Sequence, residues 1–93
     1  MAKKEELFEK ETKYCKIIKS VDLVDDEEIF SLEKIYIKSL KREEIRIALY
    51  KNCRDRERKF IARAVDIEEE KLITLISLGI KAGIIRKRFK ESI

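Results

Sequence analysis

The feature that most constrains this chain is the near absence of residues that interrupt regular structure. Its 93 residues include no proline and only two glycines, Gly79 and Gly83. Because proline and glycine mark most turns and linkers, nothing divides the sequence into two domains. We therefore expect one domain over residues 1–93, of the all-α class, with four to five helices packed into a compact core.

Apolar residues at three- and four-residue steps predict helices in the N-terminal part, residues 1–42. The first expected helix covers residues 3–20, and the second covers about 27–41, with Asp25 or Asp26 as its cap. This helical pair would pack on the rest of the chain or form a dimer interface. A third helix is expected from about 43 to 52.

The stretch 60–85, FIARAVDIEEEKLITLISLGIKAGII, reads as a short helix to about Val65, a tight turn and a longer helix from about Glu68. The longer helix closes on Ala82-Gly83-Ile84-Ile85. Over residues of about 44–90 this order resembles a winged helix-turn-helix with a truncated or missing wing. The resemblance implies a helix-turn-helix in residues 43–93 and a DNA-binding function.

By that resemblance, the longer helix, from about Glu68, would be the one that meets DNA. It would present Lys71, Thr74, Ser77 and Lys81 to DNA, and Leu72, Ile76 and Gly79 to the core. Three acidic residues, Glu68–Glu70, stand in its first turn. They favour the helix dipole, but they would repel phosphates. Arginine, asparagine and glutamine, which read base edges best, are missing from this helix.

Charge is uneven along the chain. Residues 1–46 hold 11 Lys and Arg against 12 Asp and Glu, net −1, whereas residues 47–93 hold 12 against 7, net +5. A basic surplus favours phosphate contacts that are independent of sequence and sensitive to salt, although a solvated charged surface explains it equally well. The remaining DNA-binding candidates in this half are Arg54, Arg56, Lys59, Arg63, Arg86, Lys87, Arg88 and Lys90.

The helix expected from about Glu68 is apolar on nearly all sides. Ile73, Leu78 and Ile80 add to its inward set, and a helix of this kind is buried all round or meets a partner. The N-terminal helices would cover these residues, or a partner protein or second copy would bind there. Both alternatives remain open from the sequence.

Aromatic and cysteine residues add little that is specific. Tyr14, Tyr36, Tyr50 and Phe60 fall at helical apolar positions and are expected in the core, which leaves Phe89 as the aromatic candidate for stacking on bases. Cys15 and Cys53 have no histidine to join them, so no zinc site or other cofactor is expected. The sequence is consistent with a disulfide between these two cysteines and equally with two separate buried thiols.

Several classes of function are excluded by what the sequence lacks. It has no histidine, no glycine-rich phosphate loop and no hydrolase or metalloprotease motif, so we expect neither an enzyme nor a small-molecule substrate. It has no apolar run long enough to span a membrane and no secretory signal, which favours a cytoplasmic location. Abundant Lys and Glu with one Asn and no Gln resemble proteins of hyperthermophiles.

Two functional hypotheses follow. In the first, the chain is a small DNA-associated protein, similar to a transcription regulator or an accessory component of a replication or transcription assembly. In the second, it is a protein-interaction adaptor without DNA contact, in which Ile73 belongs to the docking surface.

Overall fold

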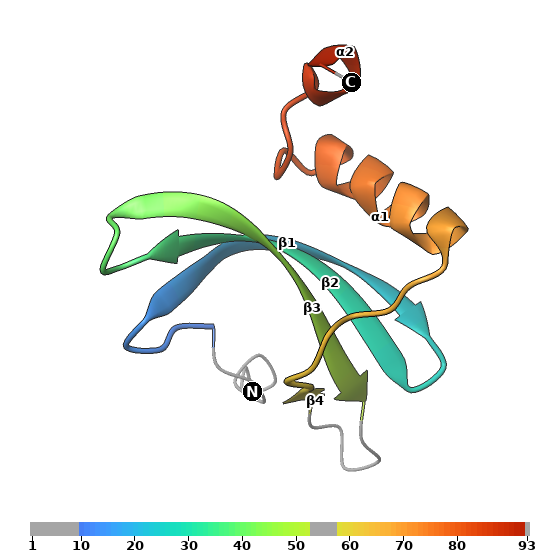
Figure 1. Ribbon diagram of the computed structural model, residues 1–93, viewed down its shortest axis with the longest axis horizontal. Coiled ribbons are helices and arrows are strands. Elements are labelled where there is room, and N and C mark those ends of the chain that lie inside the picture. Colours follow the sequence, from blue (N-terminus) through green and yellow to red (C-terminus); the bar gives the residue numbers. More distant parts are fainter. Residues whose placement is uncertain (1–9, 53–57, 93) are drawn as a thin grey trace, which may run out of the picture.

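The computed structural model describes residues 10–52 and 58–92, which contain four strands followed by two helices. The strands are β1 (Cys15–Asp25), β2 (Glu28–Ile37), β3 (Arg42–Asn52) and β4 (Arg58–Phe60), and the helices are α1 (Glu69–Lys81) and α2 (Phe89–Ser92). The strands form one antiparallel sheet in the order β1-β2-β3-β4, with α1 against one face (Figure 1). The all-α prediction is therefore wrong, because the described chain is mainly β-sheet.

The expected N-terminal helices are replaced by the three long strands. In β3, Ile45, Ile47 and Leu49 alternate with residues on the opposite face, and the isoleucines favour extended backbone. Val21 and Leu23 alternate in the same way in β1. The expected helices over 27–41 and 43–52 are wrong, as is the part of helix 3–20 that falls within the described residues.

Two tight turns join the long strands without the residues that usually signal a hairpin. The first turn, at Asp26-Glu27, has a positive φ of 56° at Asp26, and the turn at residues 38–41 has 54° at Lys41. Glycine or asparagine most often supplies this left-handed conformation. Since lysine rarely does, the second hairpin is hidden in the sequence.

The helix-turn-helix prediction is also wrong. β4 and a segment without regular secondary structure over residues 61–68 stand where the first helix of the motif was expected, so α1 has no helical partner across a tight turn. α1 itself occupies the segment of the expected second helix. It follows Glu68, has Glu69 and Glu70 in its first turn, and ends before Gly83, which has a φ of 81°. None of the described helices is long and apolar enough to cross a membrane.

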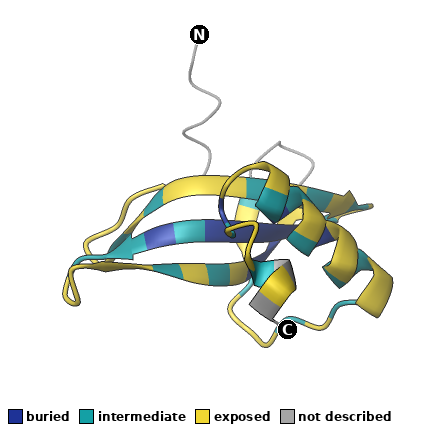
Figure 2. Ribbon diagram, turned by 90° about the horizontal axis from the view of Figure 1, so that it is seen from above, coloured by how far each residue is buried: buried dark blue, intermediate teal, exposed yellow. Residues whose placement is uncertain are grey.

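The main core lies between α1 and the sheet face that α1 covers, here called the helix face. Leu75 of α1 is fully buried against a cluster that also contains Phe30, Leu32, Leu49 and Ile84. A Cβ at position 79 would overlap the side chain of Leu32, so glycine at this position allows α1 to lie close to β2. Figure 2 shows the buried positions concentrated along the middle of the sheet.

The opposite face, here called the inner face, is concave. A register irregularity between Ile17 and Lys19 bends β1. Arg58 of β4 contacts Asp22 of β1, with 3.3 Å between Nη1 and Oδ2, although β2 and β3 lie between these strands. In a flat sheet the outer strands would stand about 14 Å apart. The contact therefore requires the sheet to curl toward the inner face, as Figure 1 shows.

Candidate functional site

A buried carboxylate organises the inner face. Glu33 stands opposite Arg46 in the pairing of β2 with β3, and its side chain is only 2% exposed. The Nε of Arg46 donates a hydrogen bond to Oε1 at 2.8 Å, and the hydroxyl of Tyr50 donates to Oε2 at 2.6 Å. A buried carboxylate is tolerated when it is paired and hydrogen-bonded in this way. Glu33 thus fixes the positions of both donors.

The same contacts shift the protonation equilibria of the two donors. Burial, followed by the hydrogen bond to Glu33, raises the pKa of Tyr50 well above the usual range of a phenol. Burial acts to lower the pKa of Arg46, but the hydrogen bond and charge of Glu33 outweigh it and raise that pKa. Tyr50 is therefore a neutral hydrogen-bond donor and Arg46 a fixed cation at neutral pH.

Aromatic and cationic side chains continue from this cluster toward β4. The guanidinium carbon of Arg58 lies 4.6 Å from the ring centroid of Tyr50, which is close enough for a cation–π contact. The ring of Phe60 meets the ring of Tyr50 edge to face, with centroids 5.8 Å apart. Phe60 is nevertheless 57% exposed. One ring surface of the inner face thus remains accessible to a ligand.

Residues 10–14 form the other side of the site. This segment folds back beside β1, where Ile17 N–H donates to the Lys10 carbonyl at 2.7 Å and Glu11 pairs with Lys16. Lys38 anchors it by donating from Nζ to the Thr12 carbonyl, also at 2.7 Å. Tyr14 follows directly and is 72% exposed.

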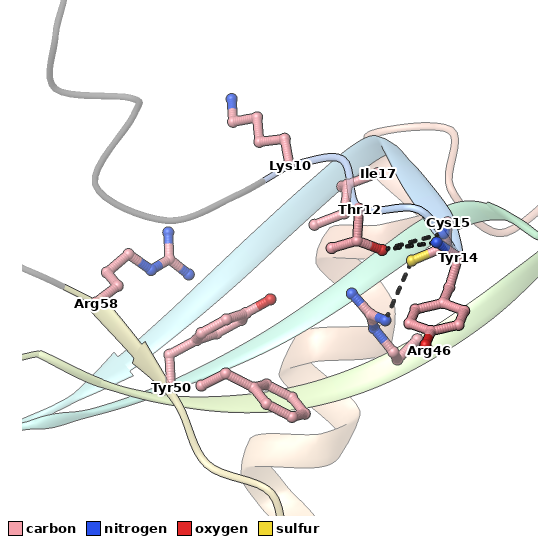
Figure 3. Close-up of a pocket in the computed structure, with 9 residues that line it drawn as sticks. Lys10, Thr12, Tyr14, Cys15, Ile17, Arg46, Tyr50 and Arg58 are labelled. Carbon is pink, nitrogen blue, oxygen red and sulfur yellow. Dashed lines mark hydrogen bonds between the residues drawn. The ribbon is translucent and has the colours of Figure 1, made fainter.

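These elements enclose a pocket of about 450 Å³ on the inner face (Figure 3). In Figure 3, Arg58 and Tyr50 stand at the left and Lys10 at the top, while Arg46 reaches toward Cys15 at the right. Among the described residues, every charged one that lines the pocket is basic, although Asp22 and Glu33 lie close by. The described residues that line it are Lys10, Thr12, Tyr14, Cys15, Ile17, Arg46, Tyr50, Arg58 and Phe60.

The side chains of this lining can bind an anion and a planar group. Lys10, Arg46 and Arg58 can meet an anion, and the rings of Tyr14 and Phe60 can stack on a planar group. Cys15 is a free thiol whose sulfur lies 3.6 Å from Nη1 of Arg46. Across residues 10–52 and 58–92, no three or more His, Cys, Asp or Glu side chains are grouped to hold a metal ion.

The predicted DNA-binding residues of α1 and the segment before it do not gather at this pocket. Lys71 is held by Asp25 at 2.7 Å and Glu68 at 3.3 Å, and Thr74 donates to the Glu70 carbonyl. The other members of this group that the structure describes, Lys59, Arg63, Ser77 and Lys81, are exposed.

The predicted basic tail lies on the other side of the sheet from the pocket. Arg86, Lys87 and Arg88 are exposed in the connection from α1 to α2, on the helix side (Figure 1). Lys90 belongs to α2, and its side chain is not described. Arg54 and Arg56 lie outside the described residues, as does Cys53.

The predicted partner-binding residues have mixed exposure. Ile73 is 51% exposed, whereas Leu78 and Ile80 are half-buried. The sheet, and not a pair of N-terminal helices, covers the inward side of α1, whose buried residues are Leu75 and Gly79. The predicted inward positions Leu72 and Ile76 are half-buried.

Most residues of the pocket were missed at the level of sequence. Tyr14 and Phe60 were expected in the core and are exposed instead, while the predicted stacking residue, Phe89, is half-buried in α2. Arg46 and Tyr50 are four residues apart, which fits one side of a helix as well as one face of a strand. The alternation of Ile45, Ile47 and Leu49 was the signal that could have placed them together on the inner face.

Comparison of the chain with models of known protein families, with characterised proteins and with solved structures gives no match.

Proposed function

We propose that this protein binds single-stranded nucleic acid in the pocket of its inner face. The observation that carries the proposal is the exposure of Tyr14 and Phe60 around a pocket whose lining, in the part of the chain that the structure describes, includes the cations Lys10, Arg46 and Arg58 and no acid. Proteins that bind single strands combine a basic groove with aromatic side chains on which bases stack. A curved sheet lined in this way presents both elements.

Charge and volume support this choice. The buried Glu33 is paired with Arg46 and Asp22 with Arg58, so neither carboxylate faces an incoming phosphate without a cation beside it. The pocket of about 450 Å³ offers more room than one base needs. Residues 10–52 and 58–92 form no helix-turn-helix and so supply no recognition helix for the major groove, and exposed rings are of use only where bases are unstacked.

The recognition expected from this site is weakly dependent on sequence. Stacking tolerates every base, and phosphate contacts carry no sequence information. An accessory role in a replication or transcription assembly, in an intracellular location, belongs to the same proposal.

Fluorescence anisotropy with a labelled oligothymidylate and with a duplex of equal length tests the proposal. We expect tighter binding of the single strand, weakened by added salt. Lys10→Ala should lower both the affinity and the salt slope, and the slope should fall by about 0.7 for each phosphate that the protein no longer neutralises. Lys87→Ala, on the helix side, is the matched control and should leave both unchanged.

Two results would count against the proposal. Equal or tighter binding of the duplex would contradict stacking of unpaired bases on the exposed rings. If an Arg86→Ala, Arg88→Ala double variant lost binding while the separate Lys10→Ala variant bound with native affinity, the site would lie in the C-terminal tail.

A further inference from the structure

The outer edge of β3 is a second surface with a defined chemistry. β4 pairs with β3 only from Tyr50 to Asn52, and one more bond joins the Ile61 N–H to the Leu49 carbonyl. From Arg42 to Ala48, no described residue pairs with β3 on the side away from β2. An edge of this length offers a template for another strand.

The groups that this edge presents follow from the position of Leu49. Its carbonyl points away from β2, since it accepts from Ile61. Backbone groups alternate in direction along an antiparallel strand, so the N–H and C=O of Ile47, Ile45 and Glu43 point outward as well. The side chains of Ile45 and Ile47 are also 47% and 41% exposed. Both the backbone and the side chains of this segment therefore remain available to a partner.

We propose that β3 of a second copy of this chain pairs antiparallel with this edge, with Ile45 opposite Ile45. In this register Ile45 pairs with its own copy and Ile47 with Glu43, so all outward backbone groups from residues 43 to 47 are satisfied. Glu44 stands opposite Arg46 of the second copy, twice, on the inner face. Opposite charges in this arrangement stabilise strand pairs.

The other two-fold registers are less favourable. Centring on Glu44 sets Glu44 against itself and Arg42 against Arg46, and centring on Arg46 sets two arginines face to face. Centring on Glu43 opposes two glutamates. Centring on Ile47 requires the Leu49 carbonyl, which already accepts from Ile61. Charge and hydrogen bonding thus select the register at Ile45.

The dimer has a consequence for the shape of the assembly. A two-fold axis perpendicular to the sheet places both inner faces on the same side and makes the two sheets continuous. The proposal concerns the strand edge alone and does not depend on nucleic-acid binding.

Disulfide cross-linking tests the register directly. In a Cys15→Ser, Cys53→Ser background, Ile45→Cys should form a covalent dimer under mild oxidation. Residues opposite each other in a hydrogen-bonded pair have Cα atoms about 5.5 Å apart, which a disulfide can span. Ile47→Cys is the matched control, because the two copies of residue 47 would lie about 14 Å apart. Equal cross-linking of both variants, or none in Ile45→Cys, would overturn the proposal.

Sedimentation equilibrium provides the second measurement. The native chain should show a mass that rises from monomer to dimer with concentration. Glu44→Lys should weaken the dimer about tenfold or more, because two attractive pairs become repulsive. Among the described contacts of the monomer it removes an exposed ion pair with Arg42, so folding should be retained. Glu27→Lys, in the β1–β2 turn, should dimerise normally. A native chain that stays monomeric, or a Glu44→Lys variant as tight as the native chain, would overturn the proposal.

Discussion

The two faces of the sheet are built from alternate residues of the same strands, yet they are held together by different forces. On the helix face, Leu32 and Leu49 pack against Leu75 of α1. On the inner face, Glu33 is buried just as deeply, but it is held by hydrogen bonds from Arg46 and Tyr50. The first arrangement depends on apolar area removed from water, and the second on paired charge and geometry.

This difference between the two faces separates the residues that stabilise the fold from those that can bind a ligand. Apolar burial on the helix face leaves few polar groups to meet a ligand. The inner face keeps cations and rings at its rim, because Arg46 and Arg58 stay partly exposed while they pair with Glu33 and Asp22. Changes on the helix face should therefore affect stability, whereas changes at the rim of the inner face should affect binding.

The largest expected effect on stability belongs to the helix face. Leu75→Ala should lower the free energy of unfolding by about 2–5 kcal/mol, because Leu75 is fully buried and its truncation leaves a cavity. Ile73→Ala, on the exposed side of the same helix, is the matched control and should cost much less. Chemical denaturation measures both. Similar losses would mean that α1 does not pack through Leu75.

The next effect concerns the buried charge pair. Arg46→Met leaves the Glu33 carboxylate buried with Tyr50 as its only remaining donor among the described contacts, and should cost about 2–4 kcal/mol. We place this below the cost for a fully buried pair because the Arg46 side chain is 34% exposed. Adding Glu33→Leu should restore much of the loss. If the double variant is less stable than Arg46→Met, the unpaired Glu33 carboxylate is not the cause of the loss.

A smaller effect is expected on binding at the rim. Phe60→Ala should weaken binding of an oligothymidylate by about 1–3 kcal/mol, the usual contribution of one stacked base, with little change in unfolding. Phe60→Trp preserves an aromatic surface and should retain affinity. Anisotropy titration compares the variants. Equal affinity of Phe60→Ala and the native chain would exclude stacking at this position.

The smallest effect is expected from alkaline titration. The raised pKa of Tyr50 means that the unfolded chain releases this proton first, near pH 10, while the folded chain keeps it. The contribution of Tyr50 to stability is thus present below pH 10 and lost as pH rises above it. The native chain should lose up to about 1.4 kcal/mol per pH unit more than Tyr50→Phe. Parallel curves for the two proteins would contradict the burial of Tyr50 together with its hydrogen bond to Glu33.

The sequence was informative for the segment that carries the start and end signals of a helix within itself. α1 has acidic residues at its start and Gly83 after its end, and it occupies the segment where the longer helix, from about Glu68, was predicted. The strands have weaker signals. Ile45, Ile47 and Leu49 alternate in β3, but most isoleucines and leucines recur at steps that suit both helix and strand, and Lys41 occupies a turn position that usually takes glycine.

The candidate site could not be predicted, since it depends on strand register. Glu33 and Arg46 meet only when β2 pairs with β3 in the observed register, and a shift of one residue would place them on opposite faces. Arg58 reaches Asp22 only because the sheet curls. Charge counting found a basic surplus but placed the binding residues in the C-terminal half, whereas the pocket draws Lys10, Tyr14 and Arg46 from the N-terminal half.

The most direct measurement is NMR titration of the labelled protein with an oligothymidylate. We expect chemical-shift changes and slowed exchange to concentrate on Lys10, Tyr14 and Phe60 of the inner face, while the amides of Arg86 to Arg88 remain unchanged. Changes confined to the C-terminal segment, or no changes anywhere in the folded protein, would contradict binding at the inner face.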